Sequence, residues 1–341
     1  MRFLKALLYI LYILSVTFVI TEIFMRFWGY SEHYLYDPIY MPYDKTTDIP
    51  YIQKPDLNNA QARGLAVINT DSLGLRSTVT GHVYEDKQDK EFRIAITGDS
   101  VTFGEGVSET ADTYTAVMQS ILNSRQQTAN VSTFNYGVSA YSVQQMWATL
   151  RHRMPESQPD LVIMSVVPED FTLSRTGTVD KWGYTAHSDG AGLLEQDSFL
   201  KRVLRKIHLT YFLRDMVYHY RHKDEKYQPG SPVDIAPDSY QYILEFQQTA
   251  QQLNLPYLLL LLPPINHTYN SDFIYKLKQN NIHFLDLTSL INEFSPEKYR
   301  TSAFDGHPSP IVHRKIAEKT AEYLLHSGLI SPVIIQDQTE Q

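Results

Sequence analysis

The strongest chemical signal in the sequence is a serine that directly follows a short apolar run. The segment reads Ile96-Thr97-Gly98-Asp99-Ser100-Val101-Thr102-Phe103-Gly104. If a strand turns into a helix here, the hydroxyl of Ser100 lies at the mouth of a sheet, beside free backbone N–H groups of the first helical turn. Those groups stabilise negative charge, and Gly98 permits the tight turn. The arrangement suits a serine nucleophile, although serine is also a common helix N-cap.

A histidine that could act as the base occurs near the other end of the chain. It lies in Phe304-Asp305-Gly306-His307-Pro308-Ser309-Pro310, between a short apolar run and the final helical pattern. In a parallel sheet this places His307 at the same edge as Ser100, where the pair could carry out acyl transfer. Asp305 is the candidate that orients His307, because residues i and i+2 of an extended segment face the same way. It could instead be a turn residue, which would leave a Ser–His dyad.

Short apolar runs alternate with helical patterns from residue 92 onward, which predicts strands joined by crossover helices. The expected strands are 93–97, 132–136, 161–167, 256–262 and 283–287, and the expected helices are 113–124, 143–153, 238–253, 272–279 and 310–325. Five such strands predict an α/β fold, a three-layer α/β/α sandwich with a flavodoxin-like parallel five-stranded sheet. Functional residues of such a sheet lie just after the strands.

Taken together, the serine and histidine blocks resemble the SGNH, or GDSL, hydrolase superfamily over roughly residues 92 to 326. The segment from Ile68 to Arg76, which contains Asn69, Gly74 and Arg76, also resembles the Asn-x-x-Gly-x-Arg signature of membrane-anchored members, although four residues rather than two separate Asn69 from Gly74. The resemblance implies that Ser100 is the nucleophile and that its backbone N–H is the first oxyanion donor. It implies that the N–H of Gly137 is the second donor, and that neither a metal nor an organic cofactor is needed.

Two positions depart from the pattern of that family. Where the family has Gly-x-Asn-Asp after the third strand, this chain has Val167-Pro168-Glu169-Asp170, so Glu169 replaces the oxyanion asparagine. Losing one oxyanion donor lowers turnover about 10²- to 10³-fold, and an ionised carboxylate would also repel the developing charge. Glu169 is therefore protonated, or points elsewhere, or the activity is weak. The acid often lies three residues before the histidine, whereas Asp305 lies two before His307.

The first 28 residues have the composition of a membrane helix. Residues 6–21 carry no charge, and the stretch from Leu4 to Trp28 is long enough to cross about 30 Å of hydrocarbon. No small-residue cleavage site follows the apolar run, which favours an uncleaved anchor over a signal peptide or a buried helix of a soluble protein. Arg2 and Lys5 predict a cytoplasmic N-terminus, with the catalytic domain in the periplasm or outside the cell.

The rest of the chain divides into three parts. Residues 29–91 are rich in Tyr, Pro, Asp and Asn and predict a stalk or a wrapped N-terminal extension, ahead of a hydrolase-like domain at 92–330 and a tail at 331–341. An insertion at about 171–237 breaks the alternation and could cap the site. Its basic amphipathic pattern could rest on anionic headgroups, steer an acidic substrate or simply pack on the core.

Composition narrows the functions further. The net charge of −8 disfavours nucleic acid as a partner, and the absence of cysteine excludes disulfides, zinc ribbons and thiol nucleophiles. The sequence predicts a membrane-anchored serine esterase acting on a small-molecule or glycan ester with an acyl or acetyl group. Two alternatives remain open. One is an O-acyl or O-acetyltransferase acting on a cell-surface glycan, and the other is a catalytically decayed binding protein, which Glu169 motivates.

Overall fold

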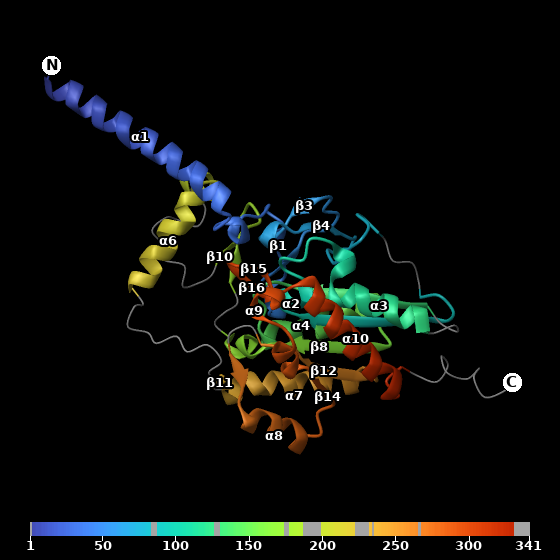
Figure 1. The fold of residues 1–341 in the computed structure, drawn as a ribbon. Coiled ribbons are helices and arrows are strands. Elements are labelled where there is room, and N and C mark those ends of the chain that lie inside the picture. The colour runs from blue at the N-terminus through green and yellow to red at the C-terminus, as the bar shows by residue number, and fades with distance from the viewer. Residues whose placement is uncertain are drawn as a thin grey trace.

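The structure of the protein, a computed structural model, consists of a layered body from which one long helix projects (Figure 1). It describes residues 2–82, 87–125, 130–173, 177–186, 199–221, 232–233, 235–264 and 267–330. The tail at 331–341 and parts of the insertion at 171–237 lie outside the described residues.

Five parallel strands form the central sheet, in the order β14-β12-β8-β6-β7. Their bounds are β6 (Glu91–Gly98), β7 (Asn130–Gly137), β8 (Leu161–Val166), β12 (Tyr257–Leu261) and β14 (Phe284–Asp286). This is the strand order of a flavodoxin-like sheet, as the sequence predicts. The direction of winding reverses between β6 and β8, and ligands of such sheets bind beyond the strand ends at that point.

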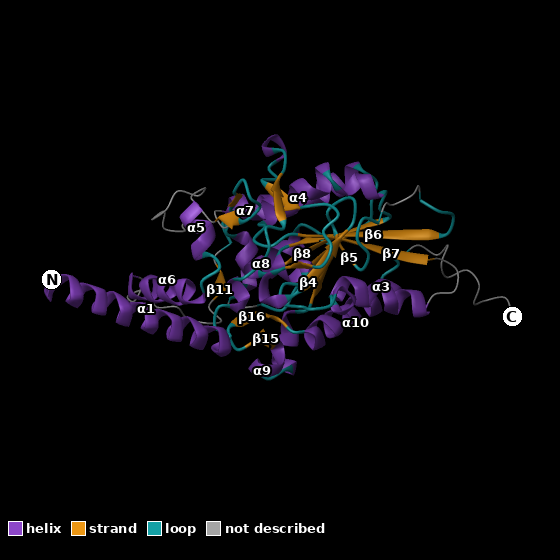
Figure 2. Cartoon of the chain, turned by 90° about the horizontal axis from the view of Figure 1, so that it is seen from above, coloured by secondary structure: helices purple, strands orange, loops and turns teal. Residues whose placement is uncertain are grey.

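Helices cover both faces of the sheet, so the strands are apolar on both sides (Figure 2). One layer holds α4 (Val143–His152), α7 (Pro237–Gln252) and α8 (Ser271–Gln279), and the other holds α3 (Tyr114–Arg125) and α10 (Pro310–His326). Alternate strand residues enter opposite cores: Leu259 and Leu261 pack in the first, Leu258 and Leu260 in the second. The five expected helices are all present, with ends shifted by at most one residue.

The region at 29–82, called the extension below, packs against the α/β body. Its strands are β1 (Tyr40–Pro42), β2 (Tyr51–Gln53), β3 (Ala60–Gln61), β4 (Val67–Thr70) and β5 (Arg76–Ser77). The hydroxyl of Tyr51 donates to the carbonyl of Ser139, and the amide of Gln53 donates to that of Gly137, each at 2.9 Å. Both acceptors lie at or beyond the end of β7, so the extension covers the carboxyl edge of the sheet.

The projecting helix is α1 (Arg2–Trp28), which is long and apolar enough to cross a membrane. Its most apolar stretch has no residue buried inside the protein. The lower end of α1 meets the start of α6, a helix of the insertion (Figure 1). The remaining elements are α2 (Ser100–Phe103), α5 (Phe199–Leu204), α6 (His208–Arg221), α9 (Pro296–Tyr299), β9 (Thr178–Val179), β10 (Thr185–Ala186), β11 (Pro232–Val233), β13 (Thr268–Tyr269), β15 (Arg300–Ser302) and β16 (Asp305–Pro308).

Candidate active site

Ser100 lies where β6 turns into α2, as the sequence predicts. Asp99 is the N-cap residue of α2, and its carboxylate accepts the backbone N–H of Val101 at 2.9 Å. A Cβ atom on Gly98 would lie 1.9 Å from the hydroxyl of Thr102, so only glycine fits at this turn. The turn therefore presents the Ser100 side chain at the carboxyl edge of the sheet.

Arg76 of the extension holds the far end of α2. Its guanidinium is buried and donates to the carbonyls of Phe103 at 3.1 Å, Gly104 at 2.6 Å and Val107 at 2.6 Å. Gly74, two residues earlier, has φ of +76°, and a Cβ atom there would lie 2.4 Å from a backbone oxygen. Arg76 thus ties the extension to the loop that follows Ser100, whereas Gly74 packs against Gln53 within the extension.

His307 and Asp305 lie on β16, which forms a hairpin with β15. The Nε2 atom of His307 is 2.9 Å from the Oγ atom of Ser100. On the other side of the ring, Nδ1 is 2.5 Å from Asp305 Oδ1, which also accepts the backbone N–H of His307. The structure therefore brings together the serine, the histidine and the acid that the sequence singled out, with the ring of His307 between the other two.

The protonation of His307 is set by nearby carboxylates. Burial lowers its pKa, but the charge of Glu105 and the hydrogen bond and charge of Asp305 outweigh burial and raise that pKa to about 9. An imidazolium donates from both ring nitrogens, and the hydroxyl of Ser100 then donates to Asp99 Oδ2, which lies 3.2 Å away. Loss of the Nε2 proton turns that nitrogen into an acceptor, so that it can take the proton of the serine hydroxyl.

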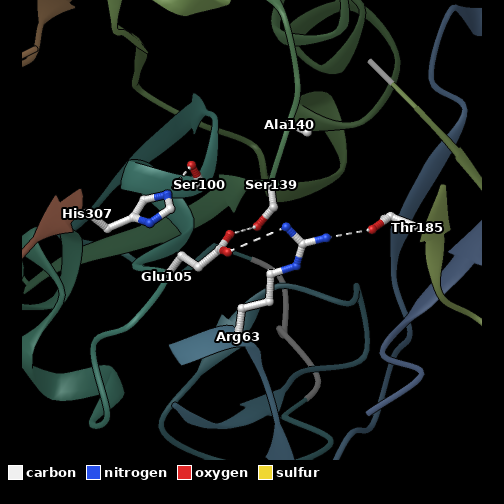
Figure 3. Close-up of a pocket in the computed structure, with 7 residues that line it drawn as sticks. All are labelled: Arg63, Ser100, Glu105, Ser139, Ala140, Thr185 and His307. Atoms are coloured by element: carbon white, nitrogen blue, oxygen red, sulfur yellow. Dashed lines mark hydrogen bonds and ion pairs between the residues drawn. The ribbon is translucent and has the colours of Figure 1, made fainter. Parts of the chain in front are cut away.

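A small polar cavity of about 120 Å³ opens at this site (Figure 3). It is lined by Arg63, Ser100, Glu105, Ser139, Ala140, Thr185 and His307. Arg63 comes from the extension and Thr185 from β10 in the insertion, so both segments close over the sheet edge. Arg63 donates to the Thr185 hydroxyl at 3.1 Å and lies 3.8 Å from a carboxylate oxygen of Glu105, which accepts the hydroxyl of Ser139 at 2.7 Å.

Gly137, the expected second oxyanion donor, does not line this cavity. Its N–H donates to the side chain of Asn135 at 3.0 Å, and it packs so tightly on α2 that a Cβ atom would lie 2.4 Å from a backbone nitrogen. Ala140 lines the cavity instead, with φ of +66° in the left-handed region. The sequence pattern points to a glycine and not to Ala140, because the identity of an alanine does not indicate a positive φ.

Glu169 also lies away from the cavity lining. It belongs to the 3-10 turn Pro168–Phe171, in which the neighbouring Asp170 accepts the backbone N–H of Val167 at 2.9 Å. The side chain is close enough to Tyr299 that its charge, after burial, helps to raise the pKa of that phenol. Glu169 is therefore not among the residues that line the cavity next to Ser100.

Five cavity residues were absent from the sequence reasoning: Arg63, Glu105, Ser139, Ala140 and Thr185. Glu105 lies only five residues after Ser100, and a carboxylate in the loop beyond the nucleophile helix was a signal that could have been read. Arg63 and Thr185 had no such signal, because nothing local to either segment shows that it folds over this edge. Within the described part of the chain, no three His, Asp or Glu side chains gather where they could hold a metal.

The sequence matches no family model and no curated protein. Several solved structures resemble the fold at low identity. A G-D-S-L family lipolytic protein from Desulfitobacterium hafniense is 16% identical with a TM-score of 0.39, over 67% of this chain and 98% of that one. A lipase/acylhydrolase from Enterococcus faecalis is 10% identical with a TM-score of 0.40, over 68% and 95%.

A third structure is a variant of an acetyl xylan esterase from Geobacillus stearothermophilus. It is 14% identical with a TM-score of 0.38, over 68% of this chain and 93% of that one. GDSL/SGNH lipolytic hydrolases and acetyl esterases are thus among the solved structures that this chain resembles in fold.

Proposed function

We propose that this protein is a serine esterase that cleaves a short acyl ester through Ser100, His307 and Asp305. The observation that carries the proposal is the 2.9 Å separation of His307 Nε2 and Ser100 Oγ, with Asp305 on the opposite ring nitrogen. A nucleophile, a base and a group that orients the base are the minimum for acyl transfer by serine.

In the proposed reaction the neutral imidazole of His307 takes the hydroxyl proton as Ser100 Oγ bonds to the ester carbonyl carbon. The resulting imidazolium returns the proton to the departing alkoxide, which leaves as the alcohol. Water then loses a proton to His307, attacks the acyl-enzyme and releases the acid. The backbone N–H groups of Ser100 and Ala140 are the proposed oxyanion donors, because both residues line the cavity.

The size and polarity of the cavity favour a short acyl group on a polar alcohol. Its volume of about 120 Å³ suits an acetyl group better than a long chain, and its lining includes a guanidinium, a carboxylate and several hydroxyls. The same lining could bind a sugar hydroxyl as an acceptor in place of water. Transfer of the acyl group to a glycan is therefore the second candidate function.

We also propose that α1 stays attached and anchors the domain to the membrane. The carboxylate of Glu22 accepts the backbone N–H groups of His208 and Leu209 at 3.0 and 2.9 Å, at the start of α6. The ring of Trp28 packs against Phe304, the residue before Asp305. A signal sequence that is removed would not cap a helix of the mature domain, so these contacts favour retention of α1. Arg2 and Lys5 orient the proposed anchor with the domain outside the cytoplasm.

Labelling of the detergent-solubilised full chain with a fluorophosphonate tests the mechanism. We expect labelling of the wild type and of S124A, which changes an exposed serine of α3, and no labelling of S100A. Hydrolysis of p-nitrophenyl acetate should disappear in H307A and persist in H326A, the matched change at an exposed histidine. A folded wild type that neither labels nor hydrolyses would remove both enzyme functions and favour a binding protein.

Hydrolysis and transfer can be separated by adding a glycan acceptor to the same assay. Appearance of an acetylated glycan at the expense of free acetate would identify the transferase. Release of acetate alone, unchanged by the acceptor, would identify the esterase.

A further inference from the structure

The outer face of α6 carries an exposed stripe of large apolar side chains. Leu213, Met216, Val217 and Tyr220 recur at helical spacing, with exposed fractions between 41% and 74%. Apolar side chains that gather on one helical face in this way mark a contact surface, whereas single exposed apolar residues are ordinary. Something other than water is therefore expected on this face.

The opposite face of α6 is already occupied by the extension. Tyr211 stacks on Tyr34, with ring centroids 5.1 Å apart, and Phe212 packs edge-on against Tyr30 at 5.5 Å. Asp215 accepts the hydroxyls of both Tyr30 and Tyr34 at 2.8 Å. These contacts fix the rotation of α6 about its own axis and leave the apolar stripe pointing away from the extension.

The helix before α6 carries a second set of exposed apolar side chains. In α5, Phe199, Leu200 and Val203 are exposed, Phe199 to 75%. A turn of three residues separates α5 from α6, and Arg26 of α1 donates to the carbonyl of Lys206 in that turn at 3.4 Å. Both sets of apolar side chains thus lie on helices joined directly beside the lower end of α1.

The neighbour that accounts for this surface is the bilayer in which α1 would lie. Glu22 caps α6, so α6 starts beside the last turns of the apolar helix, and Figures 1 and 2 both show it beside the lower part of α1. Phe24, Phe27 and Trp28 at that end of α1 are themselves exposed and continue the apolar surface. A helix held at that level meets the region between headgroups and acyl chains, where amphipathic helices bind through an apolar face.

We propose that α5 and α6 form an interfacial element whose apolar stripe inserts into the outer boundary of the membrane beside α1. This rests on the proposed function only in so far as α1 is a retained anchor. Because α1, α5 and α6 all contact the bilayer in this arrangement, the domain cannot rotate freely about the axis of α1. The packing of Trp28 and Tyr30 on Phe304, next to Asp305, then holds the catalytic hairpin close to the headgroups. The esters it reaches are those on molecules that lie at the membrane surface.

Site-directed fluorescence tests the proposal, and the absence of cysteine from the natural chain makes single labels simple. M216C and V217C would carry an NBD fluorophore on the stripe. I13C, in the middle of α1, is the reference for the bilayer, and E318C, exposed on α10, is the reference for water. Each full-length variant is reconstituted into vesicles of phosphatidylcholine and phosphatidylglycerol, with or without lipids carrying a nitroxide at carbon 5 or carbon 12.

We expect the carbon-5 nitroxide to quench labels 216 and 217 several-fold more than label 318, and label 13 to be quenched more by the carbon-12 nitroxide. If label 13 is quenched but labels 216 and 217 are quenched no more than label 318, the proposed interfacial element is wrong. The proposed anchor is then retained. A blue-shifted but unquenched label 216 would also overturn the interfacial element, because a protein surface would then cover the stripe. No quenching at 13 would remove the anchor and this inference together.

None of these readings depends on catalysis. Fluorophosphonate labelling of the same vesicles reports separately on Ser100, so failure of the esterase mechanism and failure of the membrane contact are distinguishable.

Discussion

Nearby carboxylates raise the pKa of His307, and that pKa determines the pH at which the proposed reaction can begin. Glu105 shares the cavity with His307, and Asp305 holds the far side of the ring. Because both negative charges favour the imidazolium, the pKa of His307 rises to about 9 despite burial. The proposed base is therefore mostly protonated at neutral pH, and the neutral form that accepts the Ser100 proton accumulates only as the pH rises.

The first prediction follows from the raised pKa of His307. We expect kcat/KM of the wild type to rise with pH and to level off only above about pH 9. E105Q removes one negative charge near the ring, so the pKa of His307 falls and the rising limb moves to lower pH. The measurement is kcat/KM between pH 6 and about pH 10, with E318Q on α10 as the matched control. Identical profiles for E105Q and wild type would contradict this account of His307.

The second prediction concerns Asp305 and separates a triad from a dyad. Asparagine in its place keeps the shape but removes the charge that stabilises the imidazolium and fixes the tautomer. In a triad this lowers kcat about 10³- to 10⁴-fold. Hydrolysis of p-nitrophenyl acetate by D305N measures the effect, and fluorophosphonate labelling checks that Ser100 is still presented. A loss of less than about tenfold would favour a Ser–His dyad with Asp305 as a turn residue.

At the scale of elements, the nucleophile turn depends on a segment that precedes it in the chain. The helix α2 has only four residues and cannot hold its own conformation. Arg76 accounts for its stability, since one buried guanidinium satisfies three carbonyls at and beyond the end of α2. The extension is thus part of the machinery that positions Ser100.

R76M tests this dependence. The apolar side chain leaves the buried carbonyls without their donor, which costs about 1–3 kcal/mol of the free energy of unfolding. We expect a lower thermal unfolding temperature in detergent and a lower kcat, because the turn bearing Ser100 loosens. R314M, at an exposed position of α10, is the control. Unchanged stability and kcat in R76M would show that α2 is held by other contacts.

At the scale of the whole molecule, the apolar helix and the α/β body are mechanically connected. Glu22, Trp28 and Tyr30 lie in or just after α1 and contact α6 or the hairpin of β15 and β16. The described residues therefore form a path of contacts from the proposed anchor to Asp305. Proteolytic cleavage or a substitution near residue 22 should therefore also destabilise α6 in the insertion.

E22A removes the cap of α6 and provides the fourth prediction. Loss of a cap costs about 0.5–2 kcal/mol, which corresponds to roughly a 2- to 30-fold larger population with the first turn open. We expect trypsin to cut after Arg205 or Lys206 faster by a factor in that range, measured by mass spectrometry of timed digests. E318A serves as the matched control. Equal cleavage rates in E22A and wild type would mean that α6 does not depend on α1.

What the sequence determined by itself was the order of strands and helices and the edge at which chemistry could occur. Apolar runs with helical patterns between them suffice for a parallel sheet, because strands buried on both faces must be apolar and need crossover helices. Ser100 at a strand end, and His307 with Asp305 just before the final helix, follow from the same rule. The apolar helix α1 could also be predicted from the sequence, since length and lack of charge are local properties.

The surroundings of that serine and histidine, in contrast, depend on how the whole chain folds. Gly137 and Glu169 follow the expected strands, yet the N–H of the first donates to Asn135 and the second lies near Tyr299, outside the cavity lining. Arg63 and Thr185 reach the cavity from distant segments. The direction of a side chain and the meeting of remote segments depend on packing across the whole chain, and a local pattern carries no record of that packing.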